Sequence, residues 1–333
     1  MDSQMLIEQF DRRVQRREER RRFLKSAGTV VAVAGAATAL SGCFDGDDND
    51  TEPQPAPPAA PAPAPPATVT DPDILNFALN LEYLEAQFYS FAATGAGLAA
   101  SQLTGTGTQG GVTGGRQVSF TDPVVAQYAR EIARDETQHV AFLRRALGNA
   151  AVAQPAIDIG ADPNGAFSSA ARAAGLIGAG QSFDPYANDE NFLLGAFIFE
   201  DVGVSAYKGA APLVTNPAFR DAAAGILGAE AYHAGLIRTV LYAKGLQTPS
   251  LRTATDRISD ARDSLDGASD LDQGVTGTAG KSNIVPADSD GIVFSRTTGQ
   301  VLNIVFLTRM ASMRGGFFPS RVNGAIMTSA NNG

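Results

Sequence analysis

The chain has 333 residues, a formal net charge of −9 at pH 7 and 44% hydrophobic residues. This acidic balance argues against nucleic acid as a partner, because binding to phosphate groups requires clustered Lys and Arg side chains. The single cysteine, Cys43, excludes an internal disulfide.

The first 43 residues have the pattern of an export signal rather than of a folded domain. Residues 20–25, RRRFLK, resemble the twin-arginine export motif. The Ala- and Gly-rich residues 26–40 suit a signal-peptide core but are too few to span a bilayer comfortably. Residues 40–43, LSGC, resemble a lipobox, so we expect lipidation of Cys43, export to the cell envelope or periplasm and a membrane anchor. The alternative is a basic amphipathic anchor with a chance cysteine.

Residues 44–72 are expected to form a linker. Eight prolines lie between Pro53 and Pro66. Such a segment cannot form a helix interior and favours polyproline II, which extends about 3.1 Å per residue. The segment is therefore predicted to tether a folded body to the membrane.

Two helices are predicted in the next part of the chain. Residues 71–73, DPD, are typical of a helix start, and apolar residues then recur every three or four positions until Gly95. Residues 95–120 are rich in Gly and Thr without a period, which predicts a long flexible loop. The second helix is expected to start at residues 121–123, TDP, and to end at Gly148.

Two further helices follow a long connection. Residues 149–188 have the length of a crossover, with a short helix near Ala170. The third helix is predicted over residues 189–211. The fourth is predicted to start after residues 216–217, NP, and to end at residues 244–245, KG.

The predicted fold is all-α: two αα-hairpins joined by a long crossover form a four-helix bundle over residues 73–245. Residues 246–333 are expected to be a C-terminal extension that packs on the bundle. Within it, residues 255–265 have the pattern of a polar, exposed helix, and residues 301–313 carry apolar residues at helical spacing. Residues 315–319, GGFFP, are predicted to be a glycine-hinged aromatic segment.

Both histidines of the chain end a Glu-x-x-His motif, at residues 136–139 and 230–233. Because positions i and i+3 share a helix face, each motif directs a carboxylate and an imidazole to one point. Buried carboxylates without a cation would be strongly destabilising or would have to be protonated, so the motifs predict a metal site. A shift of 94 residues aligns the two helices and also relates Arg144 to Arg238, which we interpret as charges at helix C-termini.

The first and third helices share a different spacing. Glu82 is followed seven residues later by Tyr89, and Glu200 seven residues later by Tyr207. A pseudo-twofold bundle would bring both pairs and both Glu-x-x-His motifs to one central site. Glu85 is a rival to Glu82, because it lies nearer the centre of the apolar stripe, but the repeated spacing to tyrosine favours Glu82.

Over residues 73–245 this pattern strongly resembles the ferritin-like superfamily, which includes ferritins, bacterioferritins, rubrerythrins and manganese catalases. With its LEYLEA helix segment and its GGFFP ending, the chain looks most similar, over residues 73–325, to the ferritin-like family that includes desiccation-related proteins. The resemblance implies two metal ions held by carboxylates. Their ligands would be Glu82 and Glu200 as terminal carboxylates, Glu136 and Glu230 as bridging carboxylates, and His139 and His233 as nitrogen ligands.

Tyr89 and Tyr207 are the candidate catalytic residues in this comparison, as groups that hydrogen-bond and orient ligating carboxylates. The alternative is that both are ordinary core aromatics. One imidazole per ion among several carboxylates favours iron or manganese over copper, and the absence of a thiolate ligand argues against zinc.

Two hypotheses of function follow. The first is an exported, lipid-anchored oxidoreductase, ferroxidase-like or catalase-like, whose two Fe or Mn ions act on peroxide, oxygen or ferrous iron. The second is a non-catalytic envelope or desiccation-stress protein, in which the metal site is structural or vestigial. Either could form a homo-oligomer.

Overall fold

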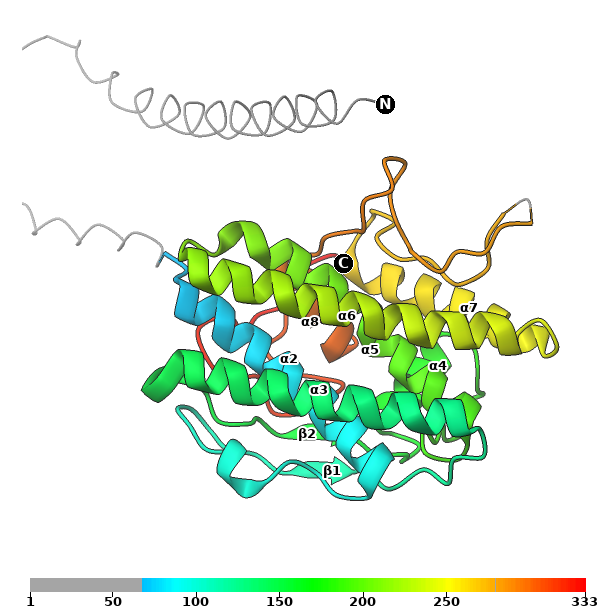
Figure 1. The fold of residues 1–333 in the computed structure, drawn as a ribbon, viewed down its shortest axis with the longest axis horizontal. Helices are drawn as coiled ribbons and strands as arrows, with labels where there is room; N and C mark the ends of the chain where they lie inside the picture. The colour runs from blue at the N-terminus through cyan, green and yellow to red at the C-terminus, as the bar shows by residue number, and fades with distance from the viewer. Residues whose placement is uncertain (1–67, 279) are drawn as a thin grey trace, which may run out of the picture. The chain divides into compact units, whose positions relative to one another are not determined.

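A computed structural model describes residues 68–278 and 280–333, and Figure 1 shows their fold. The predicted signal with Cys43, and the linker up to residue 67, lie outside the described residues. Within the described part of the chain, no helix combines the length and the apolar character that crossing a bilayer would require.

Four long helices make up the bundle: α2 (Asp71–Thr94), α3 (Pro123–Leu147), α5 (Asp189–Ala210) and α6 (Pro217–Lys244). Helix α2 packs along α3 and α5 packs along α6, so the bundle consists of two hairpins (Figure 1). Contacts between α2 and α5 and between α3 and α6 join the hairpins. This arrangement confirms the predicted fold class.

Each long helix starts after a side chain that satisfies its free backbone N–H groups. Thr70 and Asp73 do so reciprocally at α2, where the Thr70 N–H donates to Asp73 Oδ2 at 2.9 Å. Asp122, Asn188 and Asn216 accept hydrogen bonds from the first turns of α3, α5 and α6. These caps are local in sequence, which is why the helix starts agree with the predictions.

Helices α2 and α5 form the centre of the molecule. Burial covers 19 of the 24 residues of α2 and 17 of the 22 residues of α5, against 9 of 25 in α3 and 8 of 28 in α6. The outer faces of the two central helices are covered by other segments; for example, the Asn80 side chain of α2 donates to the Asn323 carbonyl at 2.8 Å. A polar side chain on α2 or α5 must therefore find its partner inside the protein.

The expected flexible loop at residues 95–120 is more regular than predicted. It contains a short 3₁₀ turn and strand β1 (Val112–Gly114), which pairs in parallel with β2 (Ile157–Ile159) of the crossover. Its glycines serve close packing: a Cβ on Gly114 would lie 2.2 Å from the Gly160 Cα. Local composition could not reveal a pairing with a segment 45 residues away. The short helix expected near Ala170 is present as α4 (Ala166–Ala173).

The two C-terminal helices differ from their predictions. Helix α7 (Pro249–Asp266) starts six residues earlier than expected and is not simply exposed, since Ile258 and Arg262 on one face are buried. Helix α8 (Thr298–Phe306) ends seven residues before the predicted end, because Leu307 takes a left-handed conformation with φ 54°. Met310, expected on the apolar stripe, is 56% exposed.

The aromatic segment at residues 315–319 folds back against the end of α8. A Cβ on Gly315, where φ is 146°, would lie 2.5 Å from the Phe306 carbonyl oxygen. The turn places Phe317 in the core, where its ring lies 4.9 Å from that of Phe199 and 5.1 Å from that of Phe167. The extension thus adds Phe317 to the cluster of aromatic side chains that includes Phe167 and Phe199.

A buried ion network connects the bundle to the extension. Arg238 of α6 and Arg262 of α7 both pair with Asp201 of α5, at 2.7 and 3.1 Å, and Arg262 also pairs with Asp272 at 2.6 Å. Both guanidinium groups also lie over the Phe197 ring. Arg238, interpreted from the sequence as a charge at a helix C-terminus, is instead buried in this network, because the extension covers it. The network is completed by Arg296 and Asp266.

Candidate metal centre

One carboxylate from each long helix reaches the centre of the bundle. They belong to Glu82 of α2, Glu136 of α3, Glu200 of α5 and Glu230 of α6, and each is at most 1% exposed. Ligand atoms of Glu82, Glu136, Glu230 and His139 all lie within 4.8 Å of one another. The pseudo-twofold repeat of the sequence therefore brings distant residues to one point.

The two histidines contact different oxygens of the Glu136 carboxylate. His139 Nδ1 is 3.3 Å from Glu82 Oε2 and 3.5 Å from Glu136 Oε2. His233 Nδ1 is 2.9 Å from Glu136 Oε1 and 3.8 Å from Glu200 Oε2. The ring centroids are 6.2 Å apart. All six predicted ligands are thus close together, and their role as ligands remains a prediction.

The two predicted tyrosines bind glutamates of the opposite hairpin. The Tyr89 hydroxyl of α2 donates to Glu200 Oε1 of α5, and the Tyr207 hydroxyl of α5 donates to Glu82 Oε1 of α2. Each bond fixes one oxygen of a carboxylate and leaves the other directed to the shared point. The tyrosines therefore contact two of the candidate carboxylates, which is the contact that the resemblance implies, although the crossing between halves was not predicted.

The free polar atoms at this point match a metal site. Eight buried atoms of the six residues have no hydrogen-bond partner among the described residues. Glu82 and Glu200 each have one such oxygen, Glu136 and Glu230 each have two, and both histidines have an unpartnered Nδ1. Leaving so many buried acceptors without a partner is very unfavourable. Carboxylate oxygens and imidazole nitrogens are a donor set that iron and manganese accept, so these residues fit such a metal centre.

Burial and like charges raise the pKa values of three of the four carboxyl groups. Burial, together with the charge of Glu136, raises the pKa of Glu82 to about 7 and that of Glu200 to about 8. Burial also raises the pKa of Glu230 well above its usual range. Burial and like charge therefore disfavour the ionisation of all these carboxyl groups at once.

The histidines outweigh the effect of burial only at Glu136. Burial would raise the pKa of Glu136, but the close contacts with His139 and His233 and the charge of both imidazoles lower it to about 2. In turn, burial would lower the histidine pKa values. The charge of Glu82 and the close contact with the Glu136 carboxylate instead raise the pKa of His139 to about 11, and contacts with Glu136 and Glu200 raise that of His233 to about 9. A bound cation would take over this compensation for all four carboxylates.

Two contributors were not identified in the sequence. Asp135 Oδ2 lies 3.5 Å from His233 Nε2, where it can orient the imidazole. Asp135 lies on α3 and His233 on α6, so no local sequence pattern indicates this contact. Gly203 of α5 makes room for Glu230, because a Cβ there would lie 2.2 Å from Glu230 Oε2. A glycine inside a buried helix, one turn from Glu200, was the available sign.

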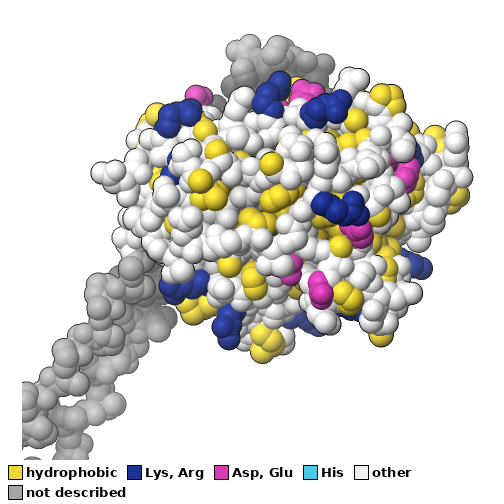
Figure 2. Space-filling model, turned by 90° about the horizontal axis from the view of Figure 1, so that it is seen from below, with side chains coloured by type: hydrophobic (Ala, Val, Ile, Leu, Met, Phe, Trp, Pro, Cys, Tyr) yellow, Lys and Arg dark blue, Asp and Glu magenta, His cyan; other side chains and the backbone are white. Residues whose placement is uncertain are grey.

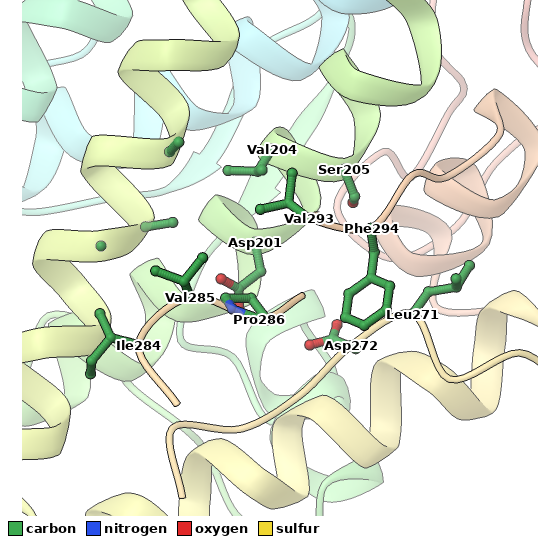
Figure 3. A pocket seen from close by; sticks show the side chains of 13 residues that line it. Asp201, Val204, Ser205, Leu271, Asp272, Ile284, Val285, Pro286, Val293 and Phe294 are labelled. Atoms are coloured by element: carbon green, nitrogen blue, oxygen red, sulfur yellow. The ribbon is translucent and has the colours of Figure 1, made fainter. Parts of the chain in front are cut away.

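A separate pocket of about 60 Å³ lies between α5, α6 and residues 271–294 (Figure 3). Most of the side chains that line it are apolar, and Asp201 and Asp272 of the ion network also line it. None of the six candidate ligands lines it. On the face of the molecule in Figure 2, acidic and basic side chains are scattered and no histidine is visible. This agrees with the burial of the candidate centre.

A family model described as "Ferritin-like domain" matches residues 70–243. Among curated proteins, "Ferritin-like catalase Nec2" of Nesocodon mauritianus is 30% identical over 270 residues, covering 77% of this chain and 84% of that protein. "Desiccation-related protein PCC13-62" of Craterostigma plantagineum is 29% identical over 268 residues, covering 77% and 83%. No solved structure gives a significant match.

Proposed function

The chain belongs to the ferritin-like domain family, and from this premise we propose that its buried centre holds two iron or manganese ions and disproportionates peroxide. The observation that carries the proposal is the distribution of free ligand atoms. One free oxygen on each of Glu82 and Glu200 suits a carboxylate that binds one ion, and two on each of Glu136 and Glu230 suit a carboxylate shared by two ions.

The choice of peroxide rests on the chemistry of the pair and on the relative named a catalase. Two redox-active ions together can exchange two electrons, which is what each half of the reaction needs: one peroxide is oxidised to oxygen and a second is reduced to water. The protein's own residues hold the geometry. Tyr89 and Tyr207 prevent Glu200 and Glu82 from rotating, and Asp135 keeps His233 in one orientation.

The proposed reaction can be measured directly. We expect the full-length chain, loaded with Mn²⁺ or Fe²⁺, to release one oxygen molecule for every two peroxide molecules consumed. The double variant Glu136→Ala, His139→Ala removes two proposed ligands at once and should lower the rate by ~100-fold or more. Replacing a residue that only positions a metal ligand already lowers metal affinity or activity by about 10–100-fold. Glu131→Ala, an exposed glutamate of the same helix, is the matched control. An equal rate in the double variant would remove this centre from the reaction.

A second candidate function is a structural role in drying stress. It is favoured by the desiccation-related protein, whose identity to this chain, 29%, is nearly the same as that of the catalase. Here the metal would only stabilise the bundle. Metal addition would then raise the midpoint of thermal unfolding without any turnover of peroxide or ferrous iron. The two functions are separated by measuring thermal unfolding with and without chelator and, on the same protein, the turnover of peroxide and of ferrous iron.

We also propose that the protein is exported and anchored to a membrane by lipid on Cys43. The support is the order of the twin-arginine motif, the apolar stretch and the LSGC segment within residues 20–43. Labelling cells with a radioactive fatty acid should label the wild-type protein and leave Cys43→Ala unlabelled. Equal labelling of both, or of neither, would contradict the anchor.

A further inference from the structure

The two halves of the candidate centre differ one helical turn after Glu82 and Glu200. A shift of 118 residues superimposes Glu82 on Glu200 and Tyr89 on Tyr207, and it places Glu85 of α2 opposite Gly203 of α5. One helix therefore carries an additional carboxylate one turn after its ligand, whereas the other carries no side chain there. A symmetric bundle has an asymmetric centre.

Glu85 and Gly203 face the same space. The position that a Cβ of Gly203 would occupy is 2.2 Å from Glu230 Oε2 and 3.5 Å from Glu85 Oε1. The missing side chain thus leaves room in which the carboxylates of Glu85 and Glu230 approach each other. Glu85 is only 6% exposed, so water does not compensate for this approach.

No other partner for Glu85 is found among the described residues. Glu85 and Gly203 also line a small cavity of about 20 Å³, whose other walls are apolar side chains such as Leu81 and Phe317. Burial, followed by the like charges of Glu136, Glu200 and Glu82, raises the pKa of Glu85 well above its usual range. A buried carboxylate in this setting must be neutralised by a proton or by a cation, and the carboxylate of Glu230, a candidate ligand, lies beside it.

We propose that Glu85 is a seventh ligand and that it makes the two metal positions unequal. This inference rests on the proposed two-ion centre. Four carboxylates balance two divalent ions, so a fifth adds a negative charge that favours whichever position it contacts. The first ion should therefore occupy one position selectively, and the second should bind more weakly. Glu82 and Glu85, which compete as the ligand of α2 in the sequence, then both bind metal.

A titration of the metal-free, full-length protein with Mn²⁺, followed by calorimetry and electron paramagnetic resonance, tests this. We expect two ions to bind in two distinct steps, and signals of coupled manganese pairs to appear only after the first equivalent. In the isosteric Glu85→Gln variant the tighter step should weaken ~10–100-fold while two ions still bind. Glu131→Gln is the control. Glu85→Gly, which copies Gly203, should bring the two affinities together.

The outcomes separate this inference from the function on which it rests. Two ions bound to wild type and to Glu85→Gln with the same affinities would overturn the role of Glu85 and leave the two-ion centre intact. Coupled pairs from the first additions to wild type would also overturn it, and this measurement needs no variant. If the wild type bound no Mn²⁺ or Fe²⁺, the proposed centre itself would be wrong.

Discussion

The full-length protein, purified without chelator, is expected to contain about two iron or manganese atoms per chain, as the two-metal bundle requires. The double variant Glu136→Ala, His139→Ala should contain almost none. Glu136 has two free oxygens and lies between the two histidines, so its loss affects both metal positions. Elemental mass spectrometry of protein and matched buffer gives the stoichiometry, and the ratio of iron to manganese identifies the metal to use in activity assays.

A control variant and a contrary result can both be named for the metal content. Glu131→Ala removes an exposed glutamate from the same helix and should keep the wild-type metal content. A wild-type protein that stays metal-free after loading with ferrous and manganous ions would show that the buried carboxylates are compensated by protons. The structural hypothesis would then be the better one.

Removing Arg262 should destabilise the protein by about 3–5 kcal/mol, the cost of breaking a buried ion pair. The Arg262→Ala variant would leave Arg238 as the remaining ion-pair partner of Asp201 and Arg296 as that of Asp272. It would also remove the hydrogen bonds that Arg262 donates to two carbonyl oxygens of α5. Because these contacts join α7 to α5, the loss should appear as a lower midpoint of unfolding in urea, measured by far-ultraviolet circular dichroism.

Arg257→Ala provides a matched comparison for this prediction. Arg257 lies on the same helix but is exposed and donates only to the Gly175 carbonyl at 3.2 Å. Its removal should change the free energy of unfolding by less than about 0.5 kcal/mol. If both variants unfolded at the same urea concentration, the network would contribute no stability of its own, and packing alone would hold the extension.

The parts of the fold that follow from neighbouring residues could be predicted from the sequence. Helix starts depend on caps such as Asp122 and Asn216, which bond to N–H groups two or three residues away. The Glu-x-x-His motifs depend only on helical periodicity, and the structure brings both to one point.

Features that depend on distant segments could not be predicted. The polar face of α7 suggested exposure, but Arg262 and Asp266 on that face are buried by pairing with residues of other segments. The β1–β2 pair joins three-residue strands, too short to leave a periodic pattern. At the candidate centre, the periodicity could not decide between Glu82 and Glu85, because both side chains face inward from a helix that is buried on nearly all sides.

The exchange of hydrogen bonds between Tyr89 and Glu200, and between Tyr207 and Glu82, bears on the ancestry of the chain. Each hairpin supplies the tyrosine that holds a carboxylate of the other hairpin, so neither has a complete centre alone. A single ancestral hairpin could have formed this arrangement only by pairing with a second copy of itself. Gene duplication and fusion through the crossover would then have allowed the copies to diverge, and the difference between Glu85 and Gly203 is a divergence that an identical pair could not have had.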